Sequence, residues 1–323
     1  MNERPLTPRQ AKLSVVIPAY REAANLKRMI PALTATLRTL VDAFEIVVVN
    51  DGSHDGTDEL MSSMAADWPV HYMSLSRNFG KEAALTAGLD VARGDAVILM
   101  DADFQHPLEV LPTFFQHWMQ GYDMVYAVRE SRDDESWLKK HGTSFFYRLM
   151  SKGSDVEITP DAGDFRLLDA KVVHALRQLH ERNRFMKGMY AWVGFRSLAI
   201  PYNPAERLEG DSAFGMTALF RLAFTGLTAF TDLPLRIWSG LGVIVSLMAL
   251  GYGAWIVLST LWFGKDVPGY ATITTSIMFF SGVQLLSVGV LGEYLARVYT
   301  EVKQRPNYLV GRQVDGSPLR ERP

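Results

Sequence analysis

The sequence contains no cysteine among its 323 residues. This absence excludes disulfide scaffolds, thiol catalysis and zinc–thiolate sites. Neither sign of charge is in large excess, and the net charge of -2 gives no electrostatic case for nucleic-acid binding. The N-terminal stretch MNERPLTPRQAK is polar and lacks the apolar core of a secretory signal, so we expect the domain that follows to stay in the cytoplasm.

Two phosphate-binding patterns are also missing. Neither G-x-G-x-x-G nor G-x-x-x-x-G-K-[ST] occurs in the turns of the N-terminal part, which disfavours dinucleotide-binding and P-loop functions.

Charged residues are absent from two long runs, Ser239–Gly264 and Tyr270–Gly292. At ~1.5 Å per residue, each run can cross a hydrocarbon core of ~30 Å. Buried core helices are the alternative, but uninterrupted apolar runs of this length are uncommon in them. We therefore predict transmembrane helices at residues 235–264 and 269–298, joined by the short connection GKDVPGY.

Basic residues indicate how this hairpin is oriented. The segment after the second span contains Arg297, Lys303, Arg305 and Arg312, whereas the connection contains only Lys265. The positive-inside rule places the tail, residues 299–323, in the cytoplasm together with the N-terminal domain.

A further apolar stretch, Phe214–Thr231, precedes the first span and contains Arg221 near its middle. A third crossing would bury that charge in lipid and put the two termini on opposite sides. We instead predict amphipathic helices at residues 211–234 that lie in the interface, with Arg221 and Arg236 at headgroup level.

Strand-like and helix-like segments alternate up to about Tyr202, which predicts a domain at residues 1–210 with a mostly parallel sheet. The expected strands lie in KLSVVIPAY, FEIVVVN, VHYMSL, DAVILMD and DMVYAVRES. Because ligands bind at the carboxyl ends of strands in such sheets, we expect Glu22, Asp51, Asp101 and Asp103 to gather at one edge.

The stretch LMDADFQHP ends a buried strand on two carboxylates, Asp101 and Asp103. A helix N-cap would need only one of them, whereas two adjacent carboxylates favour a bound cation between them. Oxygen ligands suit Mg²⁺ or Mn²⁺, and such a cation can join carboxylates to a diphosphate. The pattern predicts a nucleotide-diphosphate substrate.

Several segments together resemble family-two glycosyltransferases with the GT-A fold: VVIPAYREAANL, VVVNDGSHDGT, SRNFGKEAALTAGL and MDADFQHP. Later segments narrow the resemblance to bacterial polyprenyl-phosphate glycosyltransferases, which resemble dolichol-phosphate mannose synthases but carry two C-terminal spans: AVRESRDDE, GDFRLLDAKVV, ERNRFMKGMYAWVGF and LGEYLARVYTEVKQRPNYLV. The resemblance runs from about Leu13 to Val310. It implies an α/β, GT-A catalytic domain (Rossmann-like, mostly parallel sheet) followed by interfacial helices and a transmembrane hairpin.

The resemblance also implies roles for individual residues. Those expected at the nucleotide and metal are Asp101 and Asp103, and those expected to contact the nucleotide sugar are Pro18, Tyr20, Glu22, Asp51 and Gln105. Those expected to approach phosphate groups or the sugar are Arg129, Arg132, Arg207 and Asp164.

Two departures from the family pattern stand out. The usual Y-N-E is Tyr20-Arg21-Glu22, and the usual G-x-S-K ends in Ala213, so a basic residue expected near the lipid phosphate is absent.

The resemblance implies an inverting enzyme of the bacterial inner membrane, with both termini in the cytoplasm and a possible homo-oligomeric state. We expect it to move one sugar, with glucose as the best choice, from a UDP-sugar to undecaprenyl phosphate. A GDP-mannose-using synthase and a non-catalytic membrane scaffold are the alternatives.

Overall fold

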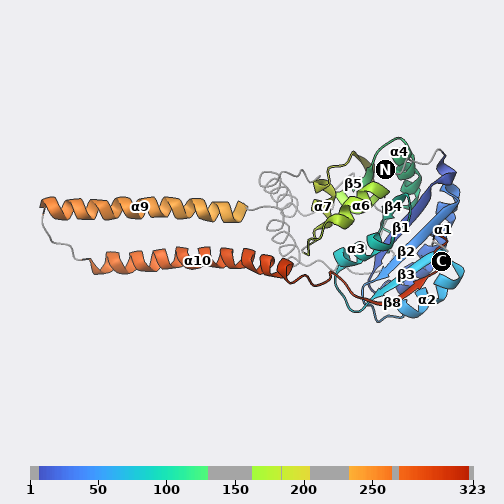
Figure 1. Cartoon of the computed structure of the whole chain (residues 1–323), viewed down its shortest axis with the longest axis horizontal. Helices are drawn as coiled ribbons and strands as arrows, with labels where there is room; N and C mark the ends of the chain where they lie inside the picture. Colours follow the sequence, from blue (N-terminus) through green and yellow to red (C-terminus); the bar gives the residue numbers. More distant parts are fainter. Residues whose placement is uncertain (1–6, 130–161, 183, 204–232, 264–268, 320–323) are drawn as a thin grey trace.

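The computed structural model describes residues 7–129, 162–182, 184–203, 233–263 and 269–319. These residues form an α/β domain and two long helices that project from it side by side (Figure 1).

Within the described residues, one eight-stranded sheet has the order β7-β5-β6-β4-β1-β2-β3-β8. β1 pairs in parallel with β2 and β4, β2 with β3, and β5 with β7, while β6 and β8 pair with their neighbours antiparallel. The predicted α/β fold with a mostly parallel sheet is confirmed. The strands are β1 (Lys12–Ala19), β2 (Ala43–Asn50), β3 (Val70–Leu75), β4 (Ala96–Leu99), β5 (Met124–Arg129), β6 (Ala162–Asp169), β7 (Ser197–Tyr202) and β8 (Val310–Asp315).

Alternation along the strands divides the core into two layers. In β1, Val15 and Ile17 face one layer and Val16 faces the other. The first layer contains α1 (Ala23–Leu40), α2 (Thr57–Asp67) and α4 (Leu111–Met119). The second contains α3 (Lys81–Val91), α6 (Ala170–Gln178) and α7 (Met186–Trp192). Two short 3₁₀ turns, Pro8–Gln10 and Leu108–Val110, precede β1 and α4.

Small side chains bring α3 close to the sheet. A Cβ atom on Gly88 would lie 2.2 Å from Cγ1 of Val16, so only glycine permits this approach. The sequence KEAALTAGL is accordingly buried from Ala83 to Leu89. This contact fixes where the first residue of α3 lies relative to the ends of the strands.

The carboxyl ends of β1, β2, β3, β4 and β5 meet at one edge of the sheet because these strands run in the same direction. β6 runs the other way and therefore begins at this edge. Since Leu99 pairs with Arg166, Asp164 lies just beyond the end of β4.

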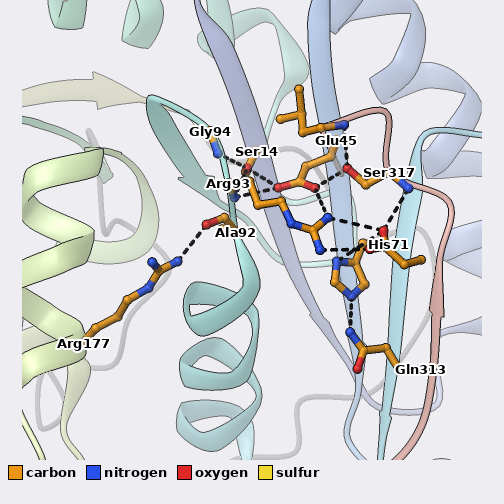
Figure 2. Close-up of polar contacts among 11 residues, drawn as sticks. Ser14, Glu45, His71, Ala92, Arg93, Gly94, Arg177, Gln313 and Ser317 are labelled. Atoms are coloured by element: carbon orange, nitrogen blue, oxygen red, sulfur yellow. Dashed lines mark hydrogen bonds and ion pairs between the residues drawn. The ribbon is translucent and has the colours of Figure 1, made fainter. Parts of the chain in front are cut away.

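The chain after α10 returns to the sheet as β8, beside β3 (Figure 1). A polar network joins it to the domain (Figure 2). The fully buried Glu45 accepts hydrogen bonds from the hydroxyls of Ser14 and Ser317. The Arg93 guanidinium contacts Asp315 at 2.9 Å. The C-terminal segment is thus part of the domain.

Two long helices, α9 (Leu233–Phe263) and α10 (Tyr270–Val302), occupy the positions of the predicted spans. Within the described residues, Phe279–Val302 is long and apolar enough to cross a membrane, with a mean hydropathy of 1.3, and Gly242–Trp255 is a shorter apolar stretch. Most of the predicted interfacial segment, residues 211–234, lies outside the described residues.

Candidate active site

An ion-pair bridge links two of the predicted site residues. The ammonium of Lys81, at the start of α3, lies 2.6 and 2.8 Å from the two carboxylate oxygens of Asp101. It also lies 2.9 Å from Oδ2 of Asp164. The other oxygen of Asp164 is buried and has no hydrogen-bond partner among the described residues. Strands β4 and β6 and helix α3 thus bring three charged groups together at the carboxyl edge.

The ionisation of this bridge follows from its charges. Burial alone would lower the pKa of Lys81, but the carboxylates of Asp164 and Asp101 raise it above its usual value. Burial would raise the pKa of Asp164, but Lys81, with help from Lys187 and Arg166, holds it well below its usual value. Both groups are therefore charged at neutral pH.

His106 shapes the turn that contains the two aspartates. Its Nδ1 atom accepts a hydrogen bond of 3.0 Å from the backbone N–H of Asp101, so Nδ1 carries no proton. The imidazole stacks on Phe165 with 4.5 Å between ring centroids. In the same turn, Asp103 Oδ1 accepts from the backbone N–H of Gln105 at 3.1 Å. Burial lowers the pKa of His106, which favours the neutral ring that this contact needs.

Glu22 lies near both aspartates, as predicted. Burial raises the pKa of Glu22, and the negative charges of Asp103 and Asp101 raise it further, against a hydrogen bond from Asn25. A carboxylate whose pKa is raised by its neighbours gains stability when a cation arrives among them.

Asp51 is engaged with the loop before α3. Its two oxygens accept hydrogen bonds from the backbone N–H groups of Phe79 and Gly80, at 2.7 and 2.9 Å. Gly52 makes the approach possible, because its φ is +68° and a Cβ there would lie 2.4 Å from the backbone of Arg77. Each oxygen of Asp51 keeps a second lone pair that can accept another hydrogen bond. The contact between Asp51 and a nucleoside stays a prediction.

The remaining predicted residues lie around this centre. Pro18 is buried in β1, and Tyr20 just beyond it is 42% exposed, with the Arg21 guanidinium 5.1 Å from its ring centroid. Arg129 is exposed at the end of β5, at the same edge of the sheet. Arg132, Arg207 and Ala213 lie outside the described residues.

Three charged residues near the ion pair of Lys81 and Asp164 were not predicted from the sequence: Arg166, Glu82 and Lys187. Arg166 is 3% exposed and packs over the Tyr190 ring, 3.7 Å from its centroid. Burial and the negative charge of Asp164 raise the pKa of Glu82 to about 8. Burial lowers the pKa of Lys187, and the negative charge of nearby Asp164 partly offsets this effect. One signal was present in the sequence: Asp164 and Arg166 are two residues apart on a strand, so they share a face.

The donor set suits a hard divalent cation. Among the described residues, no three His, Cys, Asp or Glu side chains are arranged to hold a metal ion by themselves. Mg²⁺, however, is usually held by one or two carboxylates and by substrate phosphates. Asp101 and Asp103 are two such carboxylates in one turn, so the donor set fits a cation that shares its ligands with a diphosphate.

A mostly parallel α/β sheet with carboxylates gathered at its carboxyl edge is the arrangement that the resemblance implied, that of a glycosyltransferase with the GT-A fold. The chain belongs to glycosyl transferase family 2, whose model matches residues 14–177. Residues 233–298 match a second model, the GtrB C-terminal hairpin. The resemblance noted in the sequence is confirmed.

Relatives align along nearly the whole chain. An uncharacterized glycosyltransferase of Synechocystis sp. is 46% identical over 300 residues, covering 93% of this chain and 94% of that protein. The bactoprenol glucosyl transferase of Shigella phage SfII is 43% identical, covering 95% and 100%. A prophage bactoprenol glucosyl transferase homolog of Escherichia coli K12 is 42% identical, covering 93% and 99%.

Solved structures are more distant. Glucosyl-3-phosphoglycerate synthase from Mycobacterium tuberculosis has a TM-score of 0.45 and 18% identity, covering 68% of this chain and 78% of that chain. At this distance the similarity carries no argument about ligands.

Proposed function

We propose that this glycosyltransferase moves glucose from UDP-glucose to undecaprenyl phosphate. The observation that carries the proposal is the near full-length similarity to the bactoprenol glucosyl transferases of Shigella phage SfII and Escherichia coli. The carboxyl edge supports it, because Asp101, Asp103 and Glu22 suit a cation-bound diphosphate.

Asp103 and Asp101 would hold a Mg²⁺ or Mn²⁺ ion together with the diphosphate. When bound, such a cation stabilises the negative charge that develops on the departing UDP. Lys81 contacts both oxygens of Asp101 and so restrains the orientation of this carboxylate. Glu22, Pro18, Tyr20, Asp51 and Gln105 would surround the nucleotide sugar.

The acceptor phosphate needs no strong general base. The second pKa of a phosphate monoester is about 6, so the attacking oxygen is largely ionised at neutral pH. Asp164 is a poor proton acceptor, because its pKa lies below its usual value and one of its oxygens is on Lys81. Arg129, Arg132 and Arg207 would instead neutralise the lipid phosphate. A single displacement then turns an α-linked UDP-sugar into a β-linked product.

The hairpin would bring this site to an acceptor that stays in the bilayer. In the proposed arrangement α9 and α10 cross the bacterial inner membrane, the segment 211–234 lies in the interface, and both termini are cytoplasmic. The apolar stretch Phe279–Val302 supports the crossing of α10. A homo-oligomer is compatible with this arrangement.

A panel of labelled sugar nucleotides tests the proposal. The full-length protein in detergent or nanodiscs is given undecaprenyl phosphate with UDP-glucose, UDP-galactose, UDP-N-acetylglucosamine or GDP-mannose. We expect turnover mainly with UDP-glucose and a β-linked product by NMR. Preference for GDP-mannose would establish the mannose-synthase alternative. An α-linked product would rule out a single displacement, and no turnover with any donor would favour a scaffold.

A further inference from the structure

The position of Lys81 is unfavourable for the stability of helix α3. It is the first residue of α3, where the helix dipole places partial positive charge and disfavours a cation. Its side chain is 44% exposed, so burial of its apolar stem does not account for its placement either. The contacts that offset this cost are those to Asp101 and Asp164.

The loop before α3 directs Lys81 to these carboxylates. Asp51, at the end of β2, accepts hydrogen bonds from Phe79 and Gly80, the residues immediately before Lys81. Gly80 has a φ of +99°, which an L side chain rarely adopts. Asp51 therefore fixes the loop and with it the backbone of Lys81, and the carboxylates of Asp101 and Asp164 hold the ammonium.

The carboxylates at this edge of the sheet are stabilised by a cation among them even before a substrate binds. The carboxylates of Asp101, Asp103 and Asp164 carry like charges that repel one another, and Lys81 lies between two of them. The ammonium of Lys81 contacts both oxygens of Asp101 and one of Asp164. It therefore competes with a divalent cation for these two carboxylates by charge repulsion and by holding three of their four oxygens.

We propose that the Lys81 ammonium is a built-in counter-ion of the active site, which fixes Asp101 and Asp164 and limits how tightly they bind a divalent cation before the nucleotide arrives. Lys81 is thus a positioning residue. This inference rests on the proposed use of a metal-bound nucleotide sugar. It explains how these carboxylates can stay close together before the nucleotide binds, with the diphosphate then supplying the ligands that make metal binding tight.

The test measures Mn²⁺ binding to the full-length protein without nucleotide, from the electron paramagnetic resonance signal of free Mn²⁺. Lys81→Met removes the ammonium at similar length, and we expect it to bind Mn²⁺ about fivefold more tightly than the wild type, the weight of one partly exposed charge. Its kcat for sugar transfer falls, because Asp101 is no longer held in place. Lys81→Gln, a polar substitution, is expected to change both quantities in the same direction.

Two controls separate charge from general disturbance. Lys81→Arg keeps the positive charge, so its Mn²⁺ affinity is expected to stay at the wild-type value even if its kcat falls. Lys12→Met removes an exposed lysine at the opposite edge of the sheet and should change neither quantity.

Unchanged or weaker Mn²⁺ binding in both Lys81→Met and Lys81→Gln overturns the inference, as does an absence of Mn²⁺ binding in every variant. Transfer from UDP-glucose in a chelator is a separate measurement. It decides whether the proposed metal-dependent reaction itself is wrong.

Discussion

At the scale of single residues, His106 orders the turn that contains Asp101 and Asp103. Its unprotonated Nδ1 accepts from the N–H of Asp101, and its ring stacks on Phe165. We expect His106→Phe, which keeps the ring and loses the acceptor, to lower kcat about tenfold, since a hydrogen bond of this kind contributes about 0.5–1.5 kcal/mol to holding the turn. His106→Asn can offer a side-chain oxygen near the same place and should retain more activity. Equal losses in the two variants would contradict the role of the acceptor.

The same histidine makes stability depend on pH. Its pKa is lowered in the folded state, so below the unfolded value of about 6.5 the unfolded chain binds a proton that the folded chain does not. Unfolding therefore becomes easier as the pH falls through about 6.5. Thermal unfolding of wild type and His106→Asn between neutral and mildly acidic pH should show a smaller change in the variant.

The predicted dependence of sugar transfer on a metal ion can be tested at Asp103. Asp103→Asn removes one charge from the position where the cation and diphosphate would meet, and we expect kcat to fall about 100-fold or more. The variant should unfold at a temperature close to that of the wild type. Asp67→Asn, an exposed change at the end of α2, is the matched control and should leave kcat unchanged. Full activity in a chelator, or in Asp103→Asn, would remove the metal from the mechanism.

Arg21, one of the two departures from the family pattern, has a backbone conformation that suits asparagine better. Its φ is +61°, a left-handed conformation that costs most residues about 1–2 kcal/mol and that asparagine tolerates better. We expect Arg21→Asn to raise the free energy of unfolding by about 0.5–1 kcal/mol, after loss of the contact with Tyr20. The same change at Arg38, exposed in helix α1, should lower it by a few tenths of a kcal/mol. Shifts in the same direction for both variants would refute the conformational explanation.

The sequence predicted the acidic residues at the edge but missed Lys81, Glu82, Arg166 and Lys187. The carboxylates follow strands directly, so the strand pattern alone places them. Lys81 reaches them only because Asp51 binds the preceding loop and Gly88 brings α3 close to β1. Such contacts depend on packing between distant segments, which hydrophobic periodicity does not describe.

At the scale of elements, the strands predicted from apolar runs, β1 to β5, are found close to their expected positions. β6, β7 and β8 were not predicted from the sequence. β6 contains the charged residues Asp164 and Arg166, and β8 reads VGRQVD, so neither has an apolar run. β8 follows α10 and pairs with β3 across more than 200 residues of chain. Its place is determined by buried polar contacts as much as by apolar ones.

Ser317 tests those polar contacts. Its hydroxyl donates to Glu45, a fully buried carboxylate that also contacts Ser14 and Arg93 (Figure 2). Ser317→Ala leaves part of this carboxylate unsatisfied, and we expect the free energy of unfolding to fall by about 1–3 kcal/mol. Ser63→Ala removes an exposed hydroxyl from α2 and should have almost no effect. Equal stability of Ser317→Ala and wild type in chemical unfolding would show that the network does not hold β8.

At the scale of the whole molecule, β8 constrains the orientation of the hairpin. Val302 at the end of α10 and Val310 at the start of β8 are eight residues apart, so the chain between them spans at most about 28 Å at ~3.5 Å per residue. This is too short to cross a hydrocarbon core of ~30 Å. If α10 crosses the membrane, its C-terminal end must therefore lie on the same side as the catalytic domain, which agrees with the expectation from the basic residues after the second span.

Cysteine labelling tests this topology, since the chain has no native cysteine. Lys265→Cys lies in the connection between the two helices, and we expect an impermeant thiol reagent to label it from outside intact cells. Pro318→Cys follows β8 and should be labelled only after the membrane is opened. Pro318 is exposed, whereas a Cβ on the neighbouring Gly316 would lie 2.0 Å from the backbone oxygen of Ala65, so Pro318 is the better position.

Labelling of Pro318→Cys in intact cells would place the C-terminal strand, and with it the catalytic sheet, outside. Labelling of neither variant in intact cells, but of both after opening, would mean that the connection is not exposed outside and that the hairpin does not cross.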